Sequence, residues 1–220
     1  MIKQIIGKIV EKIVTKGAKA QGGAEVKAVN LADVLGGAPE PELRVIGLYS
    51  SVEDEKIAEL TQALLYLNET NKMRDKEKEE TKPVEFYINT YGGSADDMFA
   101  MYDVMRQVQQ DTEIHTIGVG KVMSAGTLLL AAGTKGKRKI GRNCRVMIHN
   151  VAAGNFGTLP NLTNELEAIQ RLQDDYINAM VENTKFTRKK LEKLLNEKVN
   201  IYLDADEAVK YGLADEVIWG

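Results

Sequence analysis

The feature that most constrains this chain is an alternation, from residue 44 onward, between short apolar runs and segments with helical periodicity. The apolar runs have the length of strands, and the segments between them carry one apolar stripe each, as amphipathic helices do. Strands separated by helices pair in parallel, with each helix crossing over the sheet. We therefore predict an α/β fold, with strands at residues 44–49, 84–89, 113–119, 144–148, 201–203 and 217–219 and helices at residues 53–68, from Gly93 to about Gln109, 160–180, 187–196 and between the last two strands.

The length and composition favour a single folded domain. A chain of 220 residues with 44% hydrophobic positions can build one sizeable core, and a second independent domain is disfavoured. We assign residues 44–220 to this domain and residues 1–43 to an N-terminal axial or packing segment. Residues 2–14 have the spacing of an amphipathic helix, and a loose Gly- and Ala-rich connection follows, with a short helical piece near residues 31–35. The helix is expected to pack on the domain or a neighbouring subunit; a membrane-surface helix and a partner-ordered segment remain alternatives.

The charge, hydrophobicity and cysteine content limit the possible partners and cellular compartment of the protein. A net charge of −3 with 28% charged residues describes an ordinary soluble surface and gives no field for nucleic acid. No run of 18 apolar residues occurs, so no membrane span is predicted. A single cysteine, Cys144, excludes an internal disulfide, and lysines interrupt any secretory signal, so we expect a cytoplasmic protein. Cys144 lies in an apolar run and reads as a buried strand residue rather than a nucleophile. Residues 72–82 are read as a solvated helix end or loop, and neither a metal nor a cofactor is expected.

Ser124 is the first candidate for chemistry. It lies in the sequence GKVMSAG, residues 120–126, directly after a predicted strand and before an apolar helix. A serine on such a turn is exposed beside the N–H groups of the helix N-terminus, which favour developing negative charge. Taken alone, the signal is weak, because a serine before a helix is more often an ordinary N-cap.

His149 is the second candidate, because it ends the strand at residues 144–148 and open α/β sheets place their sites at strand ends. The other histidine, His115, occupies an alternating position inside a strand and reads as structural or surface-exposed. Gly92 and Gly93 follow the strand at residues 84–89 and can bring bare N–H groups close to a substrate carbonyl, although they also fit a plain turn. An elbow serine, a strand-end histidine and a glycine-built N–H site together are the parts of an acyl-transfer site.

These motifs resemble those of the ClpP peptidase family, the proteolytic subunit of an ATP-dependent protease. The resemblance covers roughly residues 44–218 and is most specific around the serine and the histidine. It is carried by the stretches YINTYGG (residues 87–93), MSAGTLLLAAG (123–133), GKR (136–138) through RVMIH (145–149) and ADEAVKYGLADEV (205–217).

The resemblance implies a ClpP/crotonase-like superhelix of repeated β-β-α units with a protruding handle helix at about residues 160–182. It implies that Ser124 is the nucleophile, that His149 is its base, and that the amides of Gly93 and Ala125 bind the oxyanion. Substrate would pair as an added strand with the segment that contains Gly154, Asn155, Phe156 and Gly157. The family assembles as heptameric rings stacked into a tetradecamer, and an AAA+ unfoldase feeds peptides or unfolded proteins into the chamber.

The sequence departs from the family pattern at the triad acid. The family has an aspartate two residues before an aromatic residue, which here is Tyr202, so the matching position is Asn200. Asparagine can accept a hydrogen bond from the imidazole but cannot supply the charge that stabilises imidazolium. Asp204 is the nearest replacement acid, but its spacing to Glu207 predicts a capping box instead. We therefore predict weakened activity, or activity that needs assembly or a partner to align His149.

Other departures concern the loops and the partner. Tyr91 and Val151 stand where the family has prolines near the glycine pair and the histidine. Polar residues enter the apolar unfoldase-docking pocket, which makes docking uncertain; its positions here include Glu85, Tyr87, Gln107, Ile117 and Ile218. The leading hypothesis is a ClpP-type endopeptidase. The rivals are a weakly active or inactive structural ring subunit, a processing peptidase of the capsid-maturation type, and a crotonase-like acyl-CoA enzyme, which the serine and histidine motifs disfavour.

Overall fold

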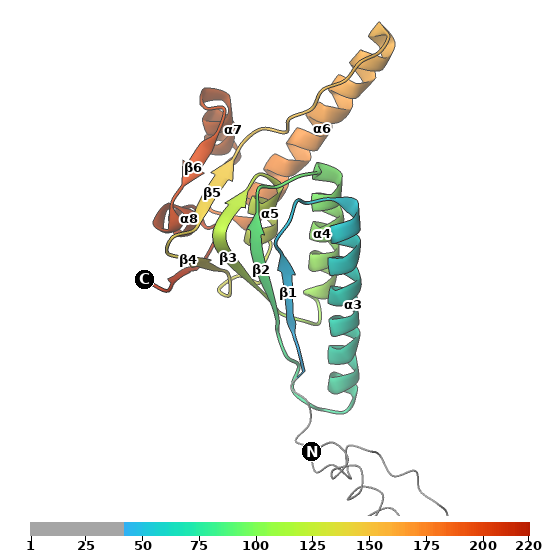
Figure 1. Cartoon of the computed structure of the whole chain (residues 1–220), viewed down its shortest axis with the longest axis vertical. Helices are drawn as coiled ribbons and strands as arrows, with labels where there is room; N and C mark the ends of the chain where they lie inside the picture. Colours follow the sequence, from blue (N-terminus) through green and yellow to red (C-terminus); the bar gives the residue numbers. More distant parts are fainter. Residues whose placement is uncertain (1–41) are drawn as a thin grey trace, which may run out of the picture. The chain divides into compact units, whose positions relative to one another are not determined.

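The computed structural model describes residues 42–220, of which Arg44–Gly220 forms one compact unit. Within this unit the chain forms six helices and seven strands, in the order predicted from the sequence except for the additional strand β4 (Figure 1). The helix predicted at residues 2–14 and the helical piece near residues 31–35 lie outside the described residues. The elements are β1 (Val45–Leu48), α3 (Asp54–Lys76), β2 (Val84–Thr90), α4 (Ala95–Val108), β3 (Ile114–Met123), α5 (Ala125–Ala131), β4 (Lys139–Gly141), β5 (Arg145–Ile148), α6 (Leu159–Asn183), α7 (Arg188–Glu197), β6 (Ile201–Leu203), α8 (Ala205–Tyr211) and β7 (Glu216–Ile218).

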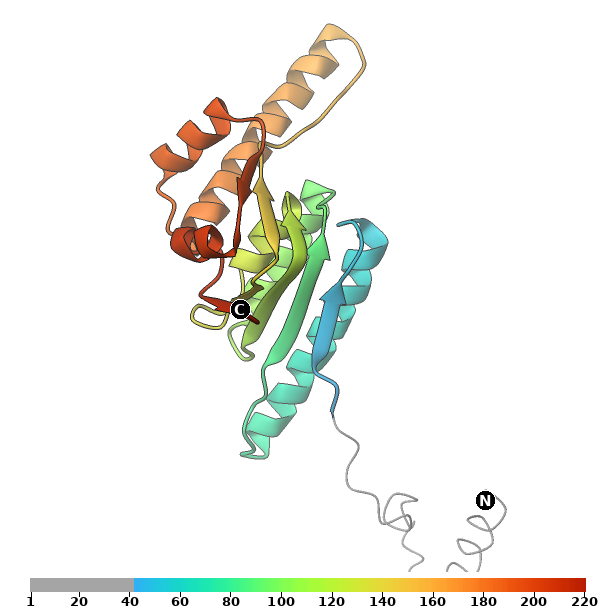
Figure 2. The ribbon, with the colours of Figure 1, turned by 60° about the vertical axis from the view of Figure 1, so that its left-hand side comes forward.

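The strands form one mixed sheet with the order β1-β2-β3-β4-β7 (Figures 1 and 2). All neighbours along this path are parallel, as predicted. The strand β5 extends from the upper part of β3, again in parallel, and β6 pairs with β5.

The expectation of parallel pairing is wrong for β6, which runs antiparallel to β5 with Ile148 opposite Ile201. Two helices, α6 and α7, separate these strands instead of one. After the second helix the chain is back at the carboxyl end of β5, so the next strand runs the opposite way. The strand β4 was not predicted, because three residues are too few to show a period.

Helices α3, α4 and α5 cover one face of the sheet and bury the core (Figure 2). The alternating burial of β2 shows how the sequence selects this face: Val84, Phe86 and Ile88 are fully buried, whereas Glu85 is exposed. All seven residues of α5 are buried, which explains its continuous apolar sequence. The buried helix α5 therefore begins directly beside the carboxyl end of β3.

Local signals set the helix ends. Ser94 caps α4 by accepting a hydrogen bond from the Asp97 N–H at 3.2 Å. Asp204 and Glu207 form the predicted capping box of α8, with N···O distances of 2.8 and 3.0 Å. The helix α3 continues to Lys76, into the charged stretch at residues 72–82, which is therefore a solvated helix end followed by a loop.

The helix α6 matches the predicted handle of residues 160–182 within one residue at each end. All of its buried residues lie between Tyr176 and Asn183, and its N-terminal half extends beyond the rest of the unit (Figure 1). The mixed sheet covered by helices and this projecting helix confirm the predicted α/β class with a protruding helix. In the described part of the chain, every helix is too short or too polar to cross a membrane.

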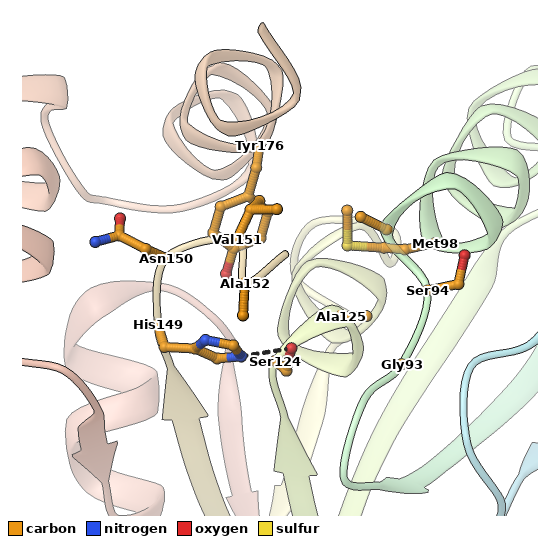
Figure 3. A pocket seen from close by; sticks show the side chains of 11 residues that line it. Gly93, Ser94, Met98, Ser124, Ala125, His149, Asn150, Val151, Ala152 and Tyr176 are labelled. Carbon is orange, nitrogen blue, oxygen red and sulfur yellow. Dashed lines mark hydrogen bonds between the residues drawn. The ribbon is translucent and has the colours of Figure 1, made fainter. Parts of the chain in front are cut away.

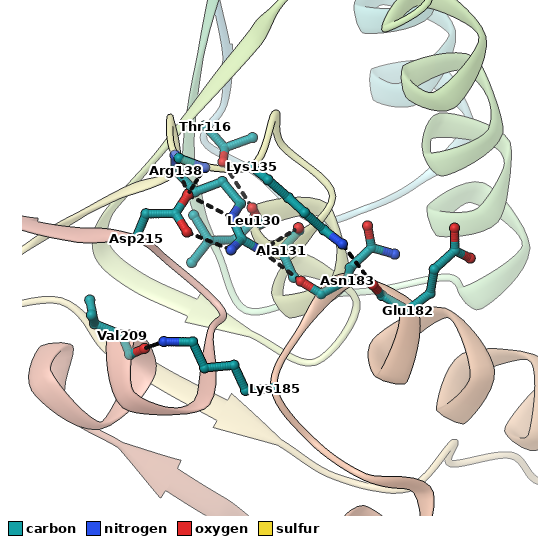
Figure 4. Close-up of polar contacts among 11 residues, drawn as sticks. Thr116, Leu130, Ala131, Lys135, Arg138, Glu182, Asn183, Lys185, Val209 and Asp215 are labelled. Atoms are coloured by element: carbon teal, nitrogen blue, oxygen red, sulfur yellow. Dashed lines mark hydrogen bonds and ion pairs between the residues drawn. The ribbon is translucent and has the colours of Figure 1, made fainter.

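A partly buried ion pair, in which the Arg138 side chain is buried, ties the C-terminal β7 region to the core (Figure 4). The Arg138 guanidinium donates to both carboxylate oxygens of Asp215, at 2.9 and 2.6 Å, and also to the carbonyls of Ala131 and Asn183. The Gly136 and Arg138 amides donate to the same carboxylate. Burial raises the pKa of Asp215, but the hydrogen bonds and charge of Arg138 outweigh it and leave the pKa below its usual value.

We predict that Asp215→Asn lowers the free energy of unfolding by roughly 3 kcal/mol at pH 7, because Arg138 would remain buried without its counter-charge. The folded pKa is lowered, so this stabilisation is present above the unfolded-state pKa and is lost as the pH falls through the folded value. Urea unfolding of wild type and variant at pH 7 and pH 3 measures both effects.

The matched control is Asp174→Asn, which removes an exposed partner of Arg188 and is expected to leave the free energy of unfolding unchanged. Equal effects of the two substitutions, or a difference between wild type and Asp215→Asn that grows toward pH 3, would contradict the assignment.

Candidate active site

Ser124 lies at the turn between β3 and α5, at the N-cap position of α5. Its φ of 51° is a left-handed value that non-glycine residues rarely adopt, and such backbone is typical of functional sites. The Ser124 N–H donates to the Met147 carbonyl at 2.8 Å, which joins the turn to β5. The side chain makes no capping hydrogen bond to α5, so the simple N-cap interpretation is wrong.

The Ser124 hydroxyl instead contacts His149 (Figure 3). The distance from Ser124 Oγ to His149 Nε2 is 2.7 Å, within hydrogen-bond range. The parallel pairing of β3 and β5 brings the two residues together, since Met123 lies opposite Met147 and both strands end at the same edge. His115 lies elsewhere on β3, where its Nε2 is 2.8 Å from the Glu113 carboxylate at the surface, as expected for a surface histidine.

The glycine pair passes directly beside the nucleophile. Gly93 forms a parallel bridge with Val52: the Val52 N–H donates to the Gly92 carbonyl at 2.9 Å, and the Ser94 N–H donates to the Val52 carbonyl at 2.8 Å. In such a bridge the N–H of Gly93 itself points away from Val52. Gly92 has a φ of 100°, and a Cβ there would lie 2.5 Å from the Ser124 Cβ. The loop can approach Ser124 this closely because it carries no side chain.

Ala125 occupies the first position of α5, where a backbone N–H has no carbonyl of its own helix to bind. Ser124, His149, Gly93 and Ala125 all line one cavity of about 200 Å³ (Figure 3). The other lining residues are Ser94, Ala95, Met98, Asn150, Val151, Ala152 and Tyr176. The lining has no charged side chain, so the cavity suits an uncharged group beside the serine hydroxyl.

Asn200 is not joined to His149 by a hydrogen bond, and no described residue donates to or accepts from His149 Nδ1. Continuing the β5–β6 register by one residue places Asn200 opposite His149, at the exposed start of β6. Asp204 is occupied by the capping box of α8. Among the described residues, the structure therefore holds a serine–histidine pair to which no acid is connected.

The segment predicted to pair with substrate does not line the cavity. Gly154, Asn155, Phe156 and Gly157 are exposed and lie in the connection from β5 to α6, which runs beside the N-terminal half of α6 (Figures 1 and 2). Their role in substrate binding stays a prediction.

Several residues of the site were not predicted. Tyr176 and Met98 line the cavity from α6 and α4, and Gln173 accepts a hydrogen bond from the Val151 N–H at 2.6 Å. Tyr176 and Met98 lie on the apolar stripes of their helices, where the sequence indicates core packing and carries no separate signal for a site.

Cys144 is buried, and burial raises the pKa of its thiol to about 11, which agrees with a structural role. The described residues contain no group of three potential metal ligands.

An α/β domain with a hydrogen-bonded serine and histidine at neighbouring strand ends has the arrangement of acyl-transfer hydrolases. The family model for the Clp proteases matches residues 41–220. The chain is also 33% identical over 175 residues to the ATP-dependent Clp protease proteolytic subunit of Deinococcus radiodurans, with 80% of each chain covered. The chain belongs to the Clp protease family, which confirms the resemblance drawn from its motifs and supports a peptidase activity.

We predict that Gly92→Ala destabilises the protein by roughly 1–3 kcal/mol, because the new Cβ would meet the Ser124 side chain at a φ that disfavours it. The same substitution in a Ser124→Gly background should cost less, since the Cβ that it meets is gone. Chemical denaturation of the four proteins of this double-mutant cycle measures the coupling. Additive effects would show that the two residues are not in contact.

Proposed function

We propose that this protein is a serine endopeptidase in which Ser124 is the nucleophile and His149 is the general base. The observation that carries the proposal is the 2.7 Å contact between Ser124 Oγ and His149 Nε2, on a turn whose backbone exposes the hydroxyl. Membership of the Clp protease family supports the same assignment.

In the proposed mechanism Ser124 Oγ attacks the carbonyl carbon of the scissile peptide while His149 Nε2 accepts the hydroxyl proton. The tetrahedral oxyanion accepts hydrogen bonds from the Gly93 and Ala125 amides. His149 then donates its proton to the leaving amine, and the C–N bond breaks to give an acyl-enzyme. Water attacks this ester with His149 as base, which releases the carboxyl product and restores the serine.

Substrate binding is proposed to use two regions. The extended peptide would form main-chain hydrogen bonds with the segment containing Gly154, Asn155, Phe156 and Gly157, so affinity would depend little on sequence. The uncharged cavity beside Ser124 would take one apolar side chain of the peptide, against Met98 and Tyr176.

We further propose that the subunits assemble into heptameric rings, stacked as a tetradecamer around a chamber. The exposed apolar side chains near the tip of the handle support this, because large apolar groups at an exposed tip are typical of contact surfaces. Phe156 is 97% and Leu159 78% exposed. The name of the Deinococcus relative states ATP dependence for that protein. An AAA+ unfoldase is the corresponding partner proposed here, although the exposed carboxylate of Glu85 disfavours an apolar docking loop.

A second candidate function is a weakly active or inactive structural subunit of such a ring. The missing hydrogen bond between Asn200 and His149 is the observation that favours it, because an imidazole without a partner on Nδ1 is not held in one tautomer. A processing peptidase with one protein substrate would share the same serine and histidine.

Fluorophosphonate labelling, peptide turnover and native mass test the proposal together. We expect wild-type protein to label and to cleave a fluorogenic peptide, with both signals lost in Ser124→Ala, and the native mass to be a multiple of seven subunits. Turnover that is equal in wild type and Ser124→Ala would exclude the peptidase and leave the structural subunit. A wild type that is active as a monomer would contradict the ring.

We predict that Asn200→Asp raises kcat for the peptide at least about 10-fold, because a carboxylate opposite His149 would stabilise imidazolium and fix the tautomer. The control is Asn196→Asp, which adds the same charge at an exposed position of α7 and should leave kcat unchanged. Equal rates for wild type and both variants would show that position 200 does not act on His149.

A further inference from the structure

The peptide that joins Ser124 to Ala125 is held by its carbonyl. The Ser124 carbonyl oxygen accepts two hydrogen bonds from one residue, Thr127: from its N–H at 2.9 Å and from its hydroxyl at 2.6 Å. A trans peptide is planar, with its C=O and N–H pointing in opposite directions. Anchoring this carbonyl therefore also sets the direction of the Ala125 N–H, which is the proposed oxyanion donor at the cavity.

The Thr127 hydroxyl is itself held by the handle helix. Tyr176 of α6 has its hydroxyl 3.0 Å from Thr127 Oγ1, and both side chains are buried. A hydroxyl has one proton, and a carbonyl can only accept, so the Thr127 proton goes to Ser124 and Tyr176 donates to Thr127. Burial raises the pKa of Tyr176 to about 12, so its hydroxyl keeps its proton at neutral pH.

The Ser124 hydroxyl takes no part in this chain of hydrogen bonds. An N-cap serine ordinarily uses its hydroxyl to bind an amide in the first turn, but Ser124 does not. Here Thr127, three residues later, bonds back to the Ser124 backbone, and the Ser124 hydroxyl reaches His149 instead. A positive φ at Ser124 needs such external restraint to persist.

We propose that Thr127 and Tyr176 are positioning residues that orient the Ala125 amide toward the oxyanion. The proposal rests on the proposed peptidase function and deepens it. Neither side chain reacts: Tyr176 holds the Thr127 hydroxyl, and Thr127 holds the peptide plane. Loss of either hydroxyl, with the rest of the side chain kept, should act on the transition state, where the oxyanion forms, and not on the binding of the peptide.

The test compares kcat and KM for one fluorogenic peptide in full-length wild type and four variants, with Ser124→Ala as the inactive reference. Thr127→Val removes the hydroxyl at nearly constant shape and should lower kcat roughly 10- to 100-fold with KM changed less than about twofold. Tyr176→Phe leaves the bond from Thr127 to Ser124 intact and should lower kcat less, by roughly 3- to 10-fold. Thr127→Ser keeps the hydroxyl and should restore kcat to near the wild-type value.

Tyr102→Phe is the matched control. The Tyr102 hydroxyl is also buried and bonded to α6, where it accepts from Asn183 Nδ2 at 2.9 Å, but Tyr102 does not line the cavity. This variant loses a comparable buried hydrogen bond and should keep wild-type kcat. Urea unfolding of all variants shows whether a change in kcat follows a change in stability.

The outcomes separate the proposal from the function on which it rests. If wild type cleaves the peptide and Thr127→Val and Tyr176→Phe match Tyr102→Phe in kcat, the positioning role is overturned and the peptidase stands. If the variants raise KM with kcat unchanged, the residues act in substrate binding and the proposal also fails. If wild type has no more turnover than Ser124→Ala, the peptidase function itself is overturned. Should Thr127→Val fail to fold, Tyr176→Phe against Tyr102→Phe still decides the question.

Discussion

The parallel pairing of β3 with β5 is the contact on which the rest of the site depends. Met123 lies opposite Met147, and the Ser124 N–H bonds to the Met147 carbonyl, so the two strand ends are locked side by side by the backbone alone. Beyond this point Ser124 turns into α5, while β5 continues for one buried residue before His149. The hydroxyl and the imidazole meet because of where each strand stops, although 25 positions separate them in the sequence.

Features set by neighbouring residues could be predicted from the sequence, whereas features set by contacts between distant segments could not. Most strands and helices were predictable because each shows its period within a few residues, and Ser124 and His149 were predictable because both follow strands whose carboxyl ends share an edge. The direction in which a strand pairs depends on the path of the whole chain, so the strand β6 was predicted but its antiparallel direction was not. The strand β4 was missed because it is too short to show a period. Thr127 and Tyr176 are 49 positions apart, one in the apolar helix α5 and the other on the buried face of α6. Their contact therefore leaves no recognisable motif in the sequence.

The residues of the site differ in how firmly the surrounding structure restrains them, and Asn200, at the position of the family's acid, is the least restrained. Ala125 and Thr127 are buried, Thr127 is hydrogen-bonded to both Ser124 and Tyr176, and Ser124 is held by β5 and by Thr127. Asn200 precedes a three-residue strand that pairs with β5 alone, and its neighbour Val199 is 87% exposed. Segments with few buried contacts open most easily, so the position opposite His149 is the least restrained part of the site. Restoring a carboxylate there would supply charge, whereas holding it against Nδ1 would still depend on this short ladder.

The helix α6 contacts the segments that follow both candidate catalytic residues. Gln173 accepts from the Val151 N–H, two residues after His149, and Tyr176 donates to Thr127, three residues after Ser124. Positions three apart lie on one face of a helix, so a single face of α6 holds the segments that follow both candidate catalytic residues. The other half of α6 is exposed and carries Leu159, Leu162 and Leu166. A continuous helix moves nearly as a rigid rod, so a subunit that packed against the exposed half would restrain both contacts at once. In the proposed ring, assembly and the geometry of the site would then be linked through one helix.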